Sequence, residues 1–130
     1  MKQLLQFVLA LILSTTFALA NSTGIVEFLD SGNIKTDNYN RGPVYIQVKD
    51  PDKNLDVSKA DTLSIFLETT TEIMAEKITL TETGANTGIF FLSINVDSAG
   101  NAVPDGKLQV RKGQEIIAAY NDSQNDYGSP

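Results

Sequence analysis

Short runs in which every second residue is apolar recur along the chain, and this alternation constrains the fold more than any other feature. Val44, Ile46 and Val48, for example, are separated by Tyr45 and Gln47. Because successive side chains of a β-strand point to opposite faces, a period of two indicates a strand with one buried face. The runs predict strands at residues 44–49, 63–68, 77–81 and 90–96, with shorter candidates at 24–29, 107–111 and 115–120.

Turn-forming residues separate these runs and leave little room for helices. The connections are rich in Asp, Asn, Gly and Pro, as in residues 50–52 and 84–88. Residues 69–77 have some helical character, but they open with threonines and continue into a strand pattern, so we interpret them as a turn entering a strand. About seven antiparallel strands predict an all-β fold, specifically an immunoglobulin-like sandwich of two sheets. With no Cys and no Trp, its core must be aliphatic and phenyl.

Residues 1–20 have the three parts of a secretory signal peptide. Lys2 is the basic start, residues 4–13 are almost entirely apolar, and Ala-Leu-Ala at residues 18–20 is a small-x-small cleavage pattern. A membrane-spanning helix needs about 20 apolar residues, roughly twice the length of this run. We therefore expect the leader to be removed, leaving one domain over residues 21–130 with no membrane span. The mature protein is expected to be secreted, at the cell surface or periplasmic.

Composition removes most catalytic and nucleic-acid-binding chemistries. The 130 residues include 16 acidic and 10 basic side chains, no Cys and no His, for a formal net charge of −6. The commonest general base, catalytic metal ligand and thiol nucleophile are therefore missing. An acidic chain also lacks the basic footprint that nucleic acids require. Since no phosphate-binding, hydrolase or metalloprotease motif occurs, we expect a protein that is not an enzyme.

The densest acidic feature is the loop that follows the strand pattern at residues 44–49. Asp50, Asp52, Asn54 and Asp56 place oxygen-bearing side chains at every second position. Calcium takes about 6–8 oxygen ligands in irregular geometry, and this loop could supply several of them. Asp, Asn and Pro are also ordinary turn residues, so the same sequence fits a plain turn. Both interpretations are open at this point.

A second acidic stretch, containing Asp122 and Asp126, closes the chain. If the strands simply alternate in direction, the 50–56 and 81–88 loops share one end of the domain, and Glu82 lies beside the first cluster. By the same rule the last strand finishes at the other end, which would place Asp122 and Asp126 at the opposite pole. Two such poles could share calcium only between molecules that stack head to tail.

Three separated motifs resemble the repeat unit of large secreted bacterial and archaeal surface proteins. They are DPDKNLD at residues 50–56, LTETGANTGIF at 80–90, and a DG-x-L-x-V stretch at 105–110 that precedes Tyr-x-Asp at 120–122. The resemblance implies an immunoglobulin-like sandwich, an extracellular structural or adhesive role, and calcium binding at the first motif. Gln114 departs from the acidic residue that the pattern has there. Such units normally occur in tandem arrays, whereas this sequence contains one.

We therefore expect a secreted structural subunit that self-associates head to tail into a filament or matrix, with calcium between its acidic poles. A heterologous contact that does not close generates a fibre. Residues 21–29 could also add a strand to a neighbour's exposed sheet edge. The alternative is a monomeric surface or periplasmic module that presents Tyr39, Tyr45 and Tyr127 to a glycan or a protein partner. A carboxylate-dependent hydrolase is a third hypothesis, and it requires a cleft with a carboxyl group of raised pKa.

Overall fold

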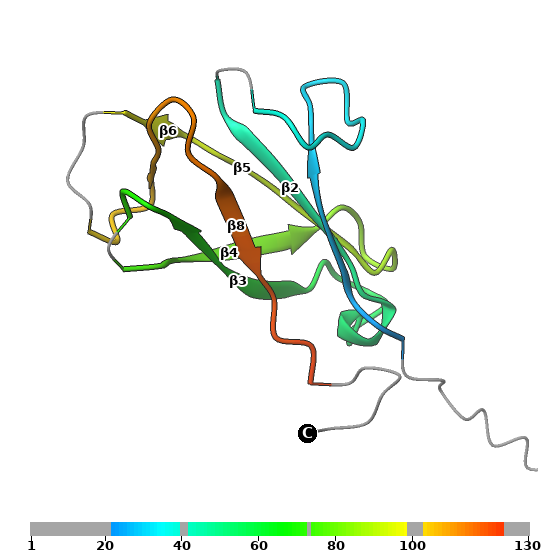
Figure 1. The fold of residues 1–130 in the computed structure, drawn as a ribbon. Coiled ribbons are helices and arrows are strands. Elements are labelled where there is room, and N and C mark those ends of the chain that lie inside the picture. The colour runs from blue at the N-terminus through cyan, green and yellow to red at the C-terminus, as the bar shows by residue number, and fades with distance from the viewer. Residues whose placement is uncertain (1–21, 40–41, 73, 99–102, 124–130) are drawn as a thin grey trace, which may run out of the picture.

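The computed structural model describes residues 22–39, 42–72, 74–98 and 103–123 (Figure 1). The predicted leader, Asp126 and Tyr127 lie outside these residues. No helix in the described residues is long and apolar enough to cross a membrane. The elements are β1 (Ile25–Leu29), β2 (Val44–Lys49), the 3-10 helix η1 (Pro51–Lys53), β3 (Thr62–Thr69), β4 (Glu76–Glu82), β5 (Ile89–Ile94), β6 (Val96–Asp97), β7 (Leu108–Gln109) and β8 (Ile116–Ala119).

Six of these strands form one antiparallel sheet in the order β1-β2-β5-β4-β3-β8. The β4–β5 junction is short, because only Thr81 with Phe91 and Glu82 with Phe90 pair there. The sheet folds over at this junction, so that β1, β2 and β5 face β4, β3 and β8 (Figure 1). The all-β, mostly antiparallel class predicted from the sequence is confirmed.

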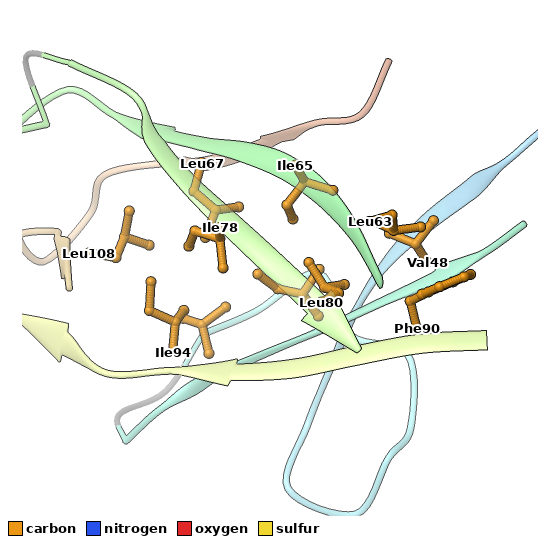
Figure 2. Close-up of a cluster of buried hydrophobic side chains, with 11 residues drawn as sticks. Val48, Leu63, Ile65, Leu67, Ile78, Leu80, Phe90, Ile94 and Leu108 are labelled. Carbon is orange, nitrogen blue, oxygen red and sulfur yellow. The ribbon is translucent and has the colours of Figure 1, made fainter. Parts of the chain in front are cut away.

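The core lies between the two halves of the folded sheet. Exposed and buried residues alternate without interruption along β3, as its period of two predicts. Figure 2 shows the buried side chains of β3 and β4 pointing toward those of β5, with Leu108 of β7 at one end of the cluster. The cluster is aliphatic except for one phenyl ring: Val44, Ile46, Val48, Leu63, Ile65, Leu67, Ile78, Leu80, Phe90, Ile94 and Leu108.

Strands β6 and β7 pair in parallel, which breaks the simple alternation of strand direction that we expected. Two buried carboxylates hold the β7 segment beside the start of β4. Glu76 Oε1 accepts a hydrogen bond from the Asp105 N–H at 2.6 Å, and Glu72 Oε2 accepts one from the Gln109 N–H at 2.9 Å. Strand β7 therefore runs in the same direction as β6. Strand β8 then returns, and it ends at the pole where β1 begins and β2 ends (Figure 1).

Residues 25–29, part of the segment that we expected to pair with a neighbour, form an edge strand of the chain's own sheet. Strand β1 pairs with β2 along its whole length, from Ile25 opposite Lys49 to Leu29 opposite Tyr45. Its outer edge is partly covered, because the Thr36 N–H donates to the Phe28 carbonyl at 2.9 Å. Within the described residues, β1 and β8 are the two edges of the six-stranded sheet.

Candidate functional site

Asp50, Asp52 and Asp122 gather around Tyr120 at one end of the sheet, which we call the acidic pole. Asp50 directly follows β2, and its Oδ1 accepts a hydrogen bond from the Asp52 N–H at 3.0 Å, which caps η1. The Tyr120 hydroxyl donates to Asp50 Oδ2 at 2.5 Å. Asp122 Oδ2 accepts from the Gly24 N–H at 2.7 Å. The prediction that Asp122 lies at the opposite pole from Asp50 is therefore wrong, because β7 does not reverse direction.

The same carboxylates hold the segment that enters β1. Asp52 Oδ2 accepts hydrogen bonds from the Ser22 N–H at 2.6 Å and the Ser22 hydroxyl at 3.3 Å. A Cβ atom at Gly24 would come within 2.6 Å of Tyr120 Cε1 and 3.1 Å of Asp50 Oδ2. Glycine is therefore the residue that lets the chain pass so close to the aromatic ring. Three segments far apart in the sequence are joined at this pole by one network.

The Tyr120 hydroxyl is the donor at the centre of this network. Burial and the hydrogen bond to Asp50 raise the pKa of Tyr120 well above its usual range, and the charges of Asp50, Asp122 and Asp52 act in the same direction. Asp50 itself is fully buried. A buried carboxylate is costly unless hydrogen bonds satisfy it, and the neutral phenol supplies one. The phenol therefore keeps its proton at neutral pH.

The remaining predicted ligands of the 50–56 loop do not converge on Asp50. Asn54 Nδ2 donates to Asn86 Oδ1 at 2.5 Å, across to the β4–β5 turn. Among the described residues, no group of three or more acidic side chains, His or Cys is placed to hold a metal ion. The contacts of this loop are those of a capped turn. Calcium binding that involves Asp126 is outside the described residues.

Asp56 and Asp61 shape the loop that follows η1. Asp61 Oδ2 accepts hydrogen bonds from the Leu55 N–H at 2.6 Å and the Asp56 N–H at 2.7 Å. Asp56 Oδ1 accepts from the Ser58 hydroxyl at 2.6 Å, and Asp56 Oδ2 pairs with Lys59 Nζ at 3.2 Å. The Ser58 hydroxyl and N–H, together with Lys59, lower the pKa of Asp56 to about 2. These carboxylates fix the shape of an exposed loop.

Glu82 lies at the acidic pole, as the direction of β4 predicted. Its Oε1 accepts hydrogen bonds from the Thr87 N–H at 2.6 Å and the Gly88 N–H at 2.7 Å, while Oε2 accepts from the Asp61 N–H at 3.1 Å. Burial alone would raise the pKa of Glu82, but the N–H groups of Asp61, Gly88 and Thr87 lower it further than burial raises it. The Gly88 carbonyl accepts from the Asp50 N–H at 2.9 Å, which links this turn to the Tyr120 network.

Tyr120, Glu72 and Glu76 were not among the site residues predicted from the sequence. A signal for Glu76 was present, because it shares the parity of Ile78 and Leu80 in β4. Residues of one parity point to one face, and in β4 that face is the buried one. Tyr120 belongs to the Tyr-x-Asp motif that the sequence reading noticed without assigning it a contact. No local pattern distinguishes Glu72 from surface acids.

The opposite end of the sheet, which we call the distal pole, contains a groove and a neighbouring hollow. There the end of β1 and the start of β8 flank a groove of about 760 Å³. Tyr39 and Tyr45 both line it, so the structure brings together two of the three tyrosines that we expected at a binding surface. A neighbouring hollow is lined by Arg111 and Lys112, which we call the basic turn.

No model of a known protein family matches this chain, and no curated protein matches it. Function is inferred from the geometry of the two poles.

Proposed function

We propose that the protein is an extracellular, non-enzymatic structural subunit that assembles head to tail through its two unlike poles. The observation that carries this proposal is the position of Asp122 beside Asp50 and Asp52, which concentrates carboxylates at one pole. At the other pole, Arg111 and Lys112 line a hollow beside a groove that is lined by Asp30, Asp37 and Glu115, so the basic side chains among these described lining residues belong to the hollow. Opposite charges attract when copies stack in one direction, and a heterologous contact that does not close makes a filament.

An immunoglobulin-like sandwich is the finer fold that we propose. It is supported by the two facing halves of the sheet and by the core that they enclose (Figures 1 and 2). Small exported domains often depend on disulfides, and this chain has no Cys. Buried carboxylates that accept main-chain N–H groups, as Glu76 and Glu82 do, hold its loops instead. The leader at residues 1–20 supports export.

A bridging cation is not required for this mode of assembly. The expected need for calcium arose from two acidic poles that would repel each other in a stack. Because Asp122 shares a pole with Asp50, the next copy presents Arg111 and Lys112 instead. Direct ion pairs weaken as salt is added, whereas a calcium bridge is lost to a chelator. The two mechanisms can therefore be separated by experiment.

The carboxylates support a structural role better than a catalytic one. The pKa values of Glu27, Asp56 and Glu82 are all shifted downward. For Glu27 the largest cause is the hydrogen bond from Lys49, which forms an ion pair with it at 2.8 Å. A carboxyl group that acts as a general acid at neutral pH needs a pKa shifted in the opposite direction.

Charge reversal at the basic turn tests the proposal. We expect Lys112→Glu to raise the concentration needed for assembly by about tenfold, the effect of losing one favourable pair across an interface. Lys77→Glu is the matched control, because Lys77 is exposed on β4 and lines neither the groove nor the hollow of the distal pole. Light scattering and electron microscopy of the mature protein give the readout. Equal assembly of the two variants would contradict the role of the basic turn.

A second candidate function is a monomeric glycan-binding module, and the groove favours it. Tyr39 and Tyr45 line the groove together, and Tyr45 stacks on Phe91 with ring centroids 6.2 Å apart. Aromatic faces beside polar groups suit sugar rings. This candidate predicts a protein that stays monomeric at all concentrations and binds oligosaccharides, with loss of binding in Tyr45→Ala. Titration calorimetry with oligosaccharides of several compositions is the test.

A further inference from the structure

The groove at the distal pole marks a place where the core is not closed. Strands β1 and β8 are the edges of the sheet, and their inward side chains Phe28 and Ile116 line the groove. These two side chains are only partly buried, whereas Ile65 and Leu67 on the inward face of β3 are fully buried. An apolar surface left half covered between two sheet edges is typical of a docking site.

The groove has an acidic character. Asp30, Asp37 and Glu115 line it, and its described lining contains no Lys or Arg. Asp30 is already used by its own turn, since its Oδ1 accepts hydrogen bonds from the Gly32 and Ile34 N–H groups at 2.8 and 2.9 Å. Asp37 and Glu115 are exposed. An occupant should therefore combine apolar side chains with positive charge.

The opposite pole carries a segment with that composition, residues 53–59 (KNLDVSK). Leu55 is 77% exposed, Val57 is 67% exposed, and the side chain of Lys59 is 70% exposed. Two exposed aliphatic residues are thus flanked by Lys53 and Lys59, and the single acid of the segment, Asp56, is already paired with Lys59. Leu55 and Val57 place two exposed aliphatic side chains close together, which gives the loop a small apolar surface that an assembly can cover.

The loop is also preformed. Asp61 accepts the Leu55 and Asp56 N–H groups, and Asp56 accepts the Ser58 N–H at 3.0 Å. A loop already held by its own hydrogen bonds loses little conformational entropy when it docks. It can therefore contribute more of its contact energy to association than a disordered segment can.

We propose that the groove of one copy takes the 53–59 loop of a second copy, with Leu55 and Val57 against Phe28 and Ile116. Lys59 would face the exposed carboxylates of Asp37 and Glu115. This inference rests on the proposed head-to-tail assembly and names its contact. The loop follows η1 at the acidic pole, whereas the groove lies at the end of β1 and the start of β8. Each copy therefore has one of each at opposite poles, and the contact repeats without closing.

The first test removes the apolar tip. Leu55→Ser/Val57→Ser changes two exposed side chains, so the protein should fold, which circular dichroism checks. We expect association at least about tenfold weaker than in the wild type. Ile117→Ser is the matched control, because Ile117 is 49% exposed on β8 but points away from the groove face. If the double variant and the control assemble as the wild type does, the loop-in-groove contact is overturned while head-to-tail assembly stands.

The second test mixes two variants, each of which has one defective and one intact surface. Leu55→Ser/Val57→Ser has lost the apolar side chains of its loop but keeps an intact groove. Asp37→Lys/Glu115→Lys has a groove of reversed charge but keeps an intact loop. Each variant alone should therefore be monomeric. An equimolar mixture should form 1:1 dimers that grow no further, because one intact loop then meets one intact groove. Failure of the mixture to form dimers, with both variants folded and the wild type assembled, would overturn the contact. A wild type that is monomeric under every condition would instead overturn the proposed function itself.

Discussion

The hydroxyl of Tyr120 donates a hydrogen bond of 2.5 Å to Oδ2 of Asp50, joining residues that are 70 positions apart. This bond fixes the end of β8 beside the end of β2 and places Asp122 at the acidic pole. Asp50 is fully buried, and the phenol supplies a hydrogen-bond donor to its carboxylate.

Removing this hydroxyl should destabilise the fold. We expect Tyr120→Phe to cost about 1–3 kcal/mol, because a buried carboxylate oxygen loses its donor. Tyr45→Phe is the control, since its ring lies on the outer face and keeps its stacking on Phe91. Urea unfolding followed by circular dichroism measures the difference. A Tyr120→Phe variant as stable as Tyr45→Phe would contradict the role assigned to the hydrogen bond.

The turn at Gly88 should tolerate no side chain. Gly88 has φ of +62°, and a Cβ there would come within 2.9 Å of Pro51 Cα. Gly113 also has positive φ, +86°, but a Cβ there would meet nothing within 4 Å. We expect Gly113→Ala to cost about 1 kcal/mol from strain, and Gly88→Ala to cost at least about 1 kcal/mol more from the clash. Equal thermal stability of the two variants would show that Pro51 moves aside freely.

The carboxylate that holds β7 should be irreplaceable by its amide. Glu76 is 2% exposed and accepts the Asp105 and Gly106 N–H groups at 2.6 and 3.3 Å. Glu76→Gln should cost about 1–3 kcal/mol, since the amide nitrogen turns a donor toward one of these N–H groups. Glu68→Gln on the exposed face of β3 is the control. Hydrogen exchange of the 105–109 amides should be faster in Glu76→Gln than in Glu68→Gln. Equal protection of these amides in the two variants would count against the role of Glu76 in holding β7.

Stability should fall as the solution is acidified. The pKa values of Asp56 and Glu82 are lower in the folded protein than in free side chains, so the folded state binds fewer protons. Their contribution is present above the unfolded pKa of about 4 and is lost as the pH falls, down to about 2 for Asp56. Urea midpoints measured between neutral and strongly acidic pH should decrease steadily. A midpoint that is independent of pH in this range would contradict the prediction.

The local period of the sequence was sufficient to predict the strands. The predicted runs at 44–49, 63–68 and 77–81 lie within β2, β3 and β4, because one buried face requires alternation at those positions. The run at 90–96 contains a break at Asn95, between β5 and β6. Breaks of this kind depend on tertiary contacts, which local alternation does not encode.

The composition of the acidic pole depended on strand direction, which the local pattern could not supply. Asp122 and Asp50 share a pole because β7 runs parallel to β6, and the β7 segment is also held by hydrogen bonds to Glu72 and Glu76. Long-range hydrogen bonds to buried acids have no signature in a single run of residues. Glu82 was placed correctly because its position depends only on β2, β3 and β4 alternating.

Light scattering of the mature wild-type protein over a range of concentrations, with calcium and with a chelator, tests the central claim most directly. Head-to-tail assembly through unlike poles predicts a mass that keeps rising with concentration, is unchanged by the chelator and falls in high salt. A monomeric mass under every condition would contradict assembly. Assembly that disappears with the chelator and survives high salt would contradict direct ion pairing and return calcium to the interface.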